Sequence, residues 1–413
     1  MFKLYSEVFK NKYFKYLWAS QILSQITINI MNFSLLLRIF EKTGSSIATS
    51  LLWVAYALPA VFFGPIGSTS TDLISKRKLL IITNLLQCLT ILIYSFLHES
   101  SFFLMYFVVL AYSFLNQFYV PSEAATLPYL VKVSDLPIAN GLFFITQQMS
   151  LIIGFGIAGL LLKIMGFNNI LFLCSIMLFF AFVSCLFLPE IKYKKLLEKD
   201  FIYSVTGFFK RIIEGYKYIK SDKYIIAPLF LLMVIQVSLA IIIVNVPSIA
   251  TNIFSISLDK AGIVIVVPAS LGALFGALLV PKILKDGKRK IKVIEDSILS
   301  LIIALGAIIF FLPIIGLVNR IIIGSILISV VGLTFMGIFI PSQTFLQEIT
   351  PKDFRGRVFG NYWFIVTIVS IFPVLVSGTI SELLGIKTFL FFLGISYALI
   401  FYLIRKKESF YFK

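Results

Sequence analysis

The sequence is built from long uncharged apolar stretches that follow one another from end to end, separated by short polar segments. A helix needs roughly 20 consecutive apolar residues to cross the hydrocarbon core of a bilayer, and each stretch has about that length. Hydrophobic residues make up 59% of the chain, charged residues only 13%, and the mean hydropathy is +1.00. This balance excludes a soluble domain and predicts an all-α membrane protein with many spans.

Twelve spans are predicted from the apolar stretches. They cover 16–37, 47–67, 79–97, 102–125, 140–162, 170–188, 224–247, 261–280, 294–312, 321–345, 358–380 and 388–404. The order predicts two six-helix bundles with a polar segment between them. We therefore expect an N-terminal bundle over 1–188, a cytoplasmic linker over 189–223, and a C-terminal bundle with a short tail over 224–413.

The basic residues predict the orientation of the spans. The chain carries 36 Lys and Arg and a net charge of +17, and alternate loops hold nearly all of them. The remaining six lie in the loops predicted on the opposite side of the membrane: Arg38, Lys42, Lys163, Lys260, Arg320 and Lys387. The positive-inside rule then places both termini in the cytoplasm and makes nucleic acid an unexpected partner. Lys in excess over Arg, with frequent Ile, Phe and Asn, suggests an AT-rich bacterial genome. The expected location is therefore the inner cell membrane of a bacterium.

The linker has the pattern of an amphipathic helix. Apolar residues recur at helical spacing at Phe208, Phe209, Ile212, Ile213, Tyr216 and Ile219, and basic or acidic residues occupy the opposite face. Such a helix is expected to lie on the inner membrane surface, with anionic membrane lipids as its partner.

The two halves carry matching features in the same order, which indicates a duplicated unit. Pro121-Ser122 recurs as Pro341-Ser342, and Gly159 with Gly166 recurs as Gly378 with Gly385. The basic triplet at 76–78 recurs at 288–290, and Gly64 has a counterpart in Gly276. The halves are therefore expected to be pseudo-symmetric.

Polar residues inside the spans are the candidates for a substrate pathway, because a buried amide or hydroxyl must face protein or water rather than lipid. They fall on one helical face of the first, fourth, seventh and tenth spans, which are equivalent helices in a three-plus-three repeat. For each residue alone, a hydrogen bond between helices explains its presence as well as contact with a substrate does. The pattern shared by the four spans favours a central substrate cavity. The candidates are Gln21, Gln25, Asn29, Asn32, Tyr112, Asn116, Tyr119, Gln236, Asn245, Met336 and Gln343.

Small residues are expected to carry the packing between helices, since lipid offers little hydrophobic force for helix association. The candidates are Gly154, Gly156, Gly159, Gly272, Gly276 and Gly378. Glu123, at the end of the fourth span, is the best-placed carboxylate for proton exchange, and a structural ion pair with a loop Lys or Arg is an equal alternative. Arg38, near an outer end, is a candidate for gating.

The sequence offers no site for covalent chemistry. It has no HExxH, GxSxG or Walker phosphate-binding motif, so neither an enzyme nor an ATP-driven pump is expected, and no cofactor or metal is predicted. His98, the single histidine, lies beside Glu99 in a short predicted loop, where a solvated surface role is expected. Cys88, Cys174 and Cys185 fall inside spans and are expected to be small core residues.

Several short motifs, taken in the order in which they occur along the chain, resemble those of the major facilitator superfamily. Within it they resemble the bacterial branch of macrolide-efflux and enterobactin-exporter-type permeases. The resemblance rests on Glu41-Lys42-Thr43-Gly44-Ser45, Phe63-Gly64-Pro65, Leu127-Pro128, Asp135-Leu136, Ala139-Asn140 and Phe354-Arg355-Gly356-Arg357-Val358. It implies the major facilitator fold and export of a small amphipathic organic compound, such as a drug, macrolide or siderophore, by alternating access in a monomer.

The loop after the second span resembles the family's conserved acidic and basic loop. Asp72, Lys76 and Arg77 match it, whereas Ser68, Leu73 and Ser75 depart from it. The resemblance implies a clasp against the eleventh span, which makes Asp72, Lys76, Arg77, Arg355 and Arg357 coupling or gating candidates. The antiporter pattern of the fifth span lacks its proline here, so proton-coupled antiport rests on the resemblance alone. Import or flipping of a metabolite or lysolipid is the alternative transport function, and a non-transporting receptor or an enzyme is the alternative of another class.

Overall fold

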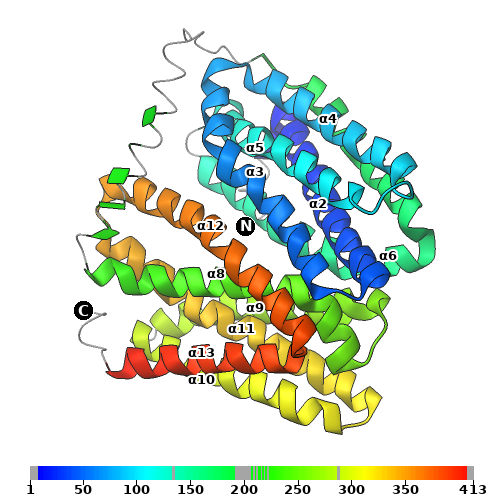
Figure 1. The fold of residues 1–413 in the computed structure, drawn as a ribbon. Coiled ribbons are helices and arrows are strands. Elements are labelled where there is room, and N and C mark those ends of the chain that lie inside the picture. Colours follow the sequence, from blue (N-terminus) through cyan, green and yellow to red (C-terminus); the bar gives the residue numbers. More distant parts are fainter. Residues whose placement is uncertain are drawn as a thin grey trace. The chain divides into compact units, whose positions relative to one another are not determined.

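The computed structural model describes residues 8–132, 135–190, 223–285 and 289–406, together with nine residues between 206 and 220. Within these helices the side chains of 72, 73, 137, 223, 352–357, 359 and 360 are not described. In the described part of the chain the regular structure is entirely helical (Figure 1). This confirms the all-α prediction.

The first half of the chain forms long apolar helices joined by short turns. They are α2 (Lys12–Thr43), α3 (Ser46–Leu73), α4 (Lys76–Leu97), α5 (Leu104–Leu130) and α6 (Leu136–Leu186). A helix rises about 1.5 Å per residue, so each of the first four is long enough to cross a bilayer of about 30 Å.

The helix α6 is too long to be a single span, because its 51 residues would extend well beyond the thickness of a bilayer. Gly166 interrupts it with φ 76° and ψ 162°, a conformation outside the helical region that glycine adopts readily. The two parts correspond to the spans predicted at 140–162 and 170–188. The sequence therefore placed the break correctly, although it predicted a longer connection between the spans.

The second half consists of six further spans, several of which are completed by tighter or wider helical turns. Its α-helices are α8 (Lys223–Ile249), α9 (Val267–Lys285), α10 (Lys290–Gly306), α11 (Leu317–Ile349), α12 (Lys352–Leu383) and α13 (Ile386–Lys406). The wider π-type turns are η2 (Ala250–Phe254), η4 (Gly262–Val266) and η5 (Ala307–Phe311), and the tighter 3-10 turns are η3 (Leu258–Lys260) and η6 (Leu312–Ile314).

The described helices include eleven that are long and apolar enough to cross a membrane, and one of these is the segment Ile138–Leu186. Division of that segment at Gly166 gives twelve spans, which confirms the predicted number. The helices extend beyond most of the predicted spans. α2, for example, begins at Lys12 and ends at Thr43.

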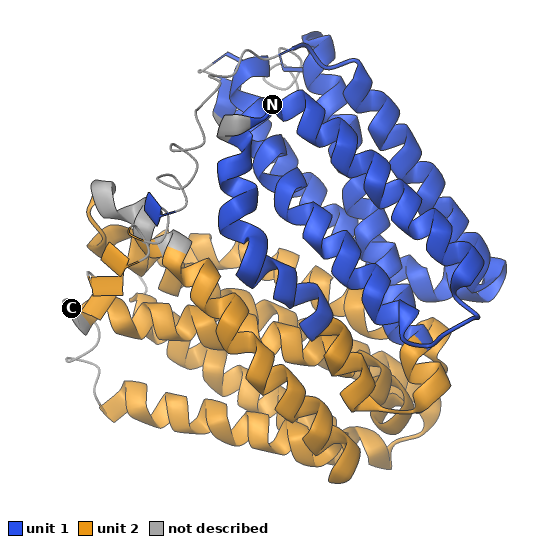
Figure 2. Cartoon of the chain, turned by 45° about the horizontal axis from the view of Figure 1, so that its top comes forward, with its two compact units in different colours: residues 1–38, 54–208 blue, residues 39–53, 209–413 orange. Residues whose placement is uncertain are grey.

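The chain divides into two compact units (Figure 2). Unit 1 comprises Met1–Arg38 and Val54–Phe208, and unit 2 comprises Ile39–Trp53 and Phe209–Lys413. The end of α2 and the start of α3 thus belong to unit 2, although the remainder of both helices belongs to unit 1. In the described part of the chain each unit has a core of buried apolar side chains: Phe14, Leu80 and Leu127 contribute to that of unit 1, and Leu229, Leu346 and Val358 to that of unit 2.

The predicted repeat is visible in the backbone. Gly166 and Gly385, which the sequence pairs as equivalents, both have positive φ, at 76° and 86°. Gly44, after the first span, and Ser255, after the seventh, also share positive φ, at 64° and 56°. In the part of the chain that is described, these four residues are the ones with positive φ. The two halves therefore have positive φ at equivalent connections.

Candidate functional site

Unit 1 contains a cluster of buried polar side chains from four helical segments, which we call the Glu123 cluster. It consists of Ser20 and Ser24 on α2, Asn84 on α4, Tyr119 and Glu123 on α5, and Cys185 at the end of α6. All six are at most 6% exposed. Among the described residues, Glu123 is the only buried Asp or Glu.

The Glu123 carboxylate is held by its own helix. The Tyr119 hydroxyl, one turn earlier on α5, donates a 2.7 Å hydrogen bond to Oε1 of Glu123. Ser20 Oγ lies 3.4 Å from the same hydroxyl, and Ser24 also hydrogen-bonds to it. Among the described residues no Lys, Arg or His side chain forms an ion pair with Glu123. The carboxylate is therefore connected to hydroxyl groups rather than to a basic partner.

Asn84 connects α2 and α4 around this cluster. Ser24 donates to its Oδ1 at 3.0 Å, and its Nδ2 lies 2.9 Å from the Leu80 carbonyl and 3.4 Å from Ser20 Oγ. The Cys185 thiol lies 3.2 Å from Ser20 Oγ. Buried polar groups in a membrane helix must find partners within the protein, and these small side chains provide them for one another.

The predicted polar face of α2 lies partly against the first part of α6. Gln21 donates from Nε2 to the Phe143 carbonyl at 3.2 Å, and Asn29 donates to the Gln25 carbonyl of its own helix at 2.8 Å. A Cβ on Gly154 would lie 2.4 Å from the Asn29 Cβ, so the two helices cross closely there. Gln25 and Asn32 are half-buried.

Three of the other candidates for the substrate pathway form hydrogen bonds within their own unit. Tyr112 is 1% exposed, and Asn116 hydrogen-bonds to Tyr56 of α3. In unit 2, Gln236 hydrogen-bonds to Tyr362, and the Asn245 amide donates to Ser377 Oγ at 3.0 Å. Half-buried Met336 and Gln343 complete the set on α11.

Four of the six predicted packing glycines, Gly154, Gly272, Gly276 and Gly378, lie where helices approach closely. A Cβ on Gly272 would meet the Ser329 carbonyl oxygen at 1.8 Å, and one on Gly276 would meet Met336 Cβ at 2.8 Å, so α9 and α11 are in backbone contact. Gly378 of α12 faces Ser46 and Ser50 in the same way. Gly156 and Gly159 are buried in α6.

The coupling and gating candidates are only partly described. Lys76 is 7% exposed and lies 5.3 Å from the Tyr129 ring centre, and Arg77 donates to the Leu186 carbonyl at 2.6 Å. Arg38 lies over the Phe167 ring at 5.6 Å. The side chains of Asp72, Arg355 and Arg357 lie outside the described residues, as do six of the twelve residues at 208–219 in the predicted amphipathic linker helix.

A second polar group in unit 2 joins the start of α3 to α8 and α12. Oε2 of Glu382 accepts a hydrogen bond from the Ile47 backbone N–H at 3.1 Å and another from the Ser45 hydroxyl. Ser46 Oγ lies 2.6 Å from Ser248 Oγ and 3.3 Å from Ser381 Oγ. Glu382 therefore supplies the negative charge that the N-terminus of a helix favours.

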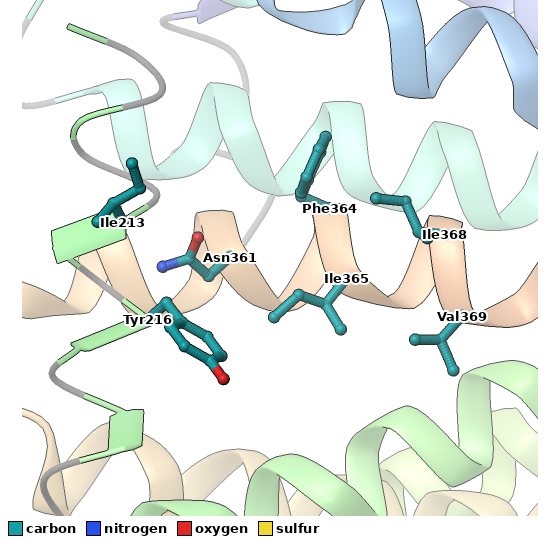
Figure 3. A pocket seen from close by; sticks show the side chains of 7 residues that line it. All are labelled: Ile213, Tyr216, Asn361, Phe364, Ile365, Ile368 and Val369. Carbon is teal, nitrogen blue, oxygen red and sulfur yellow. The ribbon is translucent and has the colours of Figure 1, made fainter.

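Unit 2 also has an apolar cavity of about 250 Å³ between α12 and two linker residues (Figure 3). Phe364, Ile365, Ile368 and Val369 line it from α12, with Asn361 at one end, and Ile213 and Tyr216 approach from the linker. Ile219, further along the linker, packs into the apolar core of unit 2. None of the residues predicted for the substrate pathway lines this cavity.

Sequence reasoning missed half of the Glu123 cluster and wrongly placed the histidine on the solvated surface. Ser20, Ser24 and Asn84 were not predicted, because they lie on α2 and α4 and only the fold brings them into one cluster with Tyr119 and Glu123 of α5. His98 is 8% exposed rather than solvated, because its Nδ1 lies 2.9 Å from the Ser95 carbonyl and its ring packs on Phe167. The three cysteines are buried and free. Within the described residues no group of His, Cys, Asp and Glu gathers as a metal site requires.

Comparison with known proteins shows which proteins this chain is similar to. The sequence profile of the Major Facilitator Superfamily matches residues 17–373. Macrolide efflux protein A of Streptococcus pyogenes is 25% identical over 382 residues, which cover 90% of each chain. The uncharacterized MFS-type transporter YfiS of Bacillus subtilis is 24% identical over 364 residues, 86% of this chain and 82% of its own. The crystal structure of the nucleoside transporter NupG covers 97% of this chain with a TM-score of 0.72 and 15% identity.

Proposed function

Because this chain belongs to the Major Facilitator Superfamily, and is therefore a multi-pass membrane transporter, we propose that it exports a small amphipathic organic compound in exchange for protons. The observation that carries the coupling is the buried Glu123 carboxylate with its hydroxyl partners. A carboxylate in this position binds and releases a proton without a basic residue to hold it charged.

The direction and the substrate class rest on the relatives. Macrolide efflux protein A is matched over 90% of its own length, so the likeness extends through both halves of the transporter. The many aromatic residues, with 43 Phe and 18 Tyr, suit an apolar and adaptable binding surface. A drug, macrolide or siderophore is the substrate class we propose, with the cell membrane of a bacterium as the location and both termini in the cytoplasm.

The polar faces of α2, α5, α8 and α11 are the proposed path of the substrate. Within unit 1 the face includes Gln25 and Asn116, and within unit 2 it includes Gln236 and Asn245, both of which hydrogen-bond to α12. Partly buried amides suit a compound with a few polar groups on an apolar body.

The test uses purified protein in proteoliposomes, with radiolabelled erythromycin as the macrolide probe. Imposed pH gradients measure driven transport, and exchange of labelled for unlabelled probe without a gradient measures substrate movement alone. We expect Glu123→Gln to lower driven transport by at least about tenfold and to leave exchange within about twofold. Glu99→Gln, an exposed carboxylate on the same unit, is the matched control and is expected to behave as the wild type.

Two results would contradict the proposal. Driven transport that is equal in the wild type with and without the pH gradient would exclude proton coupling. Failure of the wild-type protein to move erythromycin, ethidium or a catecholate siderophore in either assay would exclude the proposed substrate class.

A further inference from the structure

The apolar cavity of unit 2 follows α12 for about two helical turns. The α12 residues that line it run from Asn361 to Val369, and this part of the helix rises by about 12 Å, at about 1.5 Å per residue. Figure 3 shows these residues in a row along α12, with Ile213 and Tyr216 of the linker at the Asn361 end. The cavity therefore has one end beneath the linker and extends from there along the helix.

The cavity begins at one end of a membrane span. The apolar part of α12 that is long enough to cross a membrane is Asn361–Leu383, so Asn361 marks its first residue. One leaflet occupies about 15 Å, half of a hydrocarbon core of about 30 Å, and the cavity extends over most of that depth. Ile368 and Val369 are 40% and 42% exposed, so this wall reaches the outer surface of the helix. The cavity therefore lies at the depth of the acyl chains of one leaflet.

The walls of the cavity favour an apolar occupant. Phe364, Ile365, Ile368 and Val369 supply hydrocarbon and aromatic surface from α12, and Ile213 adds more from the linker. A cavity with apolar walls holds water poorly and takes apolar ligands. In a bilayer the apolar group available at this depth is the acyl chain of a lipid.

The linker supplies positive charge at the end of the cavity where a lipid headgroup would lie. Its described residues between 213 and 220 are helical, and Lys217 and Lys220 follow Ile213 and Tyr216 by four residues each. Residues four apart share one side of a helix, so both lysines adjoin the two lining residues. Both are exposed, and the described part of the linker contains three lysines and one acidic residue. Lysines at a membrane surface attract anionic phospholipids.

We propose that unit 2 binds one anionic phospholipid, with an acyl chain in the cavity along α12 and its phosphate beside Lys217 and Lys220. Ile219, buried in the core of unit 2, holds the linker over this site. A macrolide with its basic amine meets repulsion from the same lysines, and the residues predicted for the substrate pathway do not line the cavity. The site is therefore separate from the proposed function and does not depend on the direction or coupling of transport.

The first test measures lipid binding to the purified full chain by native mass spectrometry. Lipid-free protein in detergent is titrated with phosphatidylglycerol, which is anionic, or with phosphatidylcholine of the same acyl chains, which has no net charge. We expect the wild type to bind phosphatidylglycerol at least about tenfold more tightly, because two lysines adjoin the headgroup.

The cavity is tested with Ile368→Trp, which fills it from a partly exposed position on α12. We expect this variant to bind both lipids at least about tenfold more weakly. Ile326→Trp on α11 is the matched control, since Ile326 is also exposed and does not line the cavity. An unfolding temperature close to that of the wild type shows that each variant is folded.

The lysines are tested separately, because their removal leaves the cavity intact. The double variant with Lys217→Gln and Lys220→Gln is expected to lose the preference for phosphatidylglycerol and to bind phosphatidylcholine within about twofold of the wild type. Lys282→Gln with Lys285→Gln is the matched control, because these two lysines of α9 are also exposed and three residues apart. This control is expected to keep the preference.

Three results would overturn the proposal. Unchanged binding of phosphatidylglycerol in Ile368→Trp would place the lipid outside the cavity. Equal binding of the two lipids by the wild type would exclude recognition of an anionic headgroup. Displacement of bound phosphatidylglycerol by erythromycin in the wild type would assign the cavity to the transported compound. A failure of the transport assays leaves these measurements unaffected, so this inference and the proposed function are decided separately.

Discussion

The hydroxyl of Tyr119 donates to the carboxylate of Glu123, which follows four residues later on α5, and the two groups are buried together at 1% and 6% exposure. Residues four apart lie on the same side of a helix, so this pair forms without help from another element. The pairing gives the buried carboxylate a donor that water would otherwise provide.

Replacement of Tyr119 by Phe is therefore expected to destabilise unit 1. The change removes one hydroxyl and leaves Glu123 without its closest donor, which costs about 1–3 kcal/mol for a buried group. A lower unfolding temperature of the purified protein in detergent would show it. Tyr129→Phe, an exposed tyrosine on the same helix, is the control and is expected to leave the unfolding temperature unchanged. Equal stability of the two variants would mean that the hydroxyl contributes nothing.

The contact of α9 with α11 gives a second prediction. A Cβ on Gly272 would lie 1.8 Å from the Ser329 carbonyl oxygen, and one on Gly332 would lie 1.9 Å from the Ala269 carbonyl oxygen, so neither helix can accept a larger residue without separation. We expect Gly272→Ala to lower the free energy of unfolding by about 1–3 kcal/mol.

The control for this prediction is Gly394→Ala on α13, where a Cβ would meet no atom within 4 Å. Alanine is favoured over glycine within helices, so this change is expected to be neutral or slightly stabilising. The two variants are compared by thermal unfolding in the same detergent. An unchanged free energy of unfolding in Gly272→Ala would contradict the close contact between α9 and α11.

The helices and their order could be predicted from the sequence because hydropathy and helix length depend only on local composition. Gly166 and Gly385 were paired as equivalents from the sequence, and their shared positive φ supports the repeat. The length of α6 could not be predicted, because the polar pair at Asn168 and Asn169 suggests a loop, whereas the backbone turns at one glycine and continues as helix.

The candidate site was harder to predict than the fold. Glu123 and Tyr119 stand out as polar residues within a span, but Ser20, Ser24 and Cys185 are small and common in membrane helices, and only the fold brings them together. Asn84, Gln87 and Tyr94 recur at helical spacing on α4, and this spacing was a usable signal for a buried polar face. His98 was misassigned because its position beside a turn said nothing of Phe167, which covers it.

Glu382 gives a third prediction, because it accepts hydrogen bonds from Ser45 and from the Ile47 backbone at the start of α3. Its removal in Glu382→Ala leaves the Ile47 N–H and the Ser45 hydroxyl without this acceptor, at a cost of about 0.5–2 kcal/mol. We expect faster hydrogen–deuterium exchange at the Ile47 amide and its neighbours. Glu382→Gln keeps an acceptor oxygen and is expected to stay closer to the wild type. Unchanged exchange in Glu382→Ala would show that the remaining contacts of Ser45 and Ser46 hold this segment without the carboxylate.

The contact between Ser46 and Ser248 gives the last prediction. Their Oγ atoms lie 2.6 Å apart, and Ser46 begins a helix that continues from Val54 into unit 1. The double variant with Ser46→Cys and Ser248→Cys is therefore expected to form a disulfide under mild oxidant, while the buried native cysteines stay reduced. If transport requires this contact to open, the cross-link lowers erythromycin exchange at least about tenfold, and a reductant restores it. Each single variant, treated with the same oxidant, is the control. A cross-linked protein that still exchanges its probe at the wild-type rate would show that the start of α3 stays attached to α8 throughout the transport cycle.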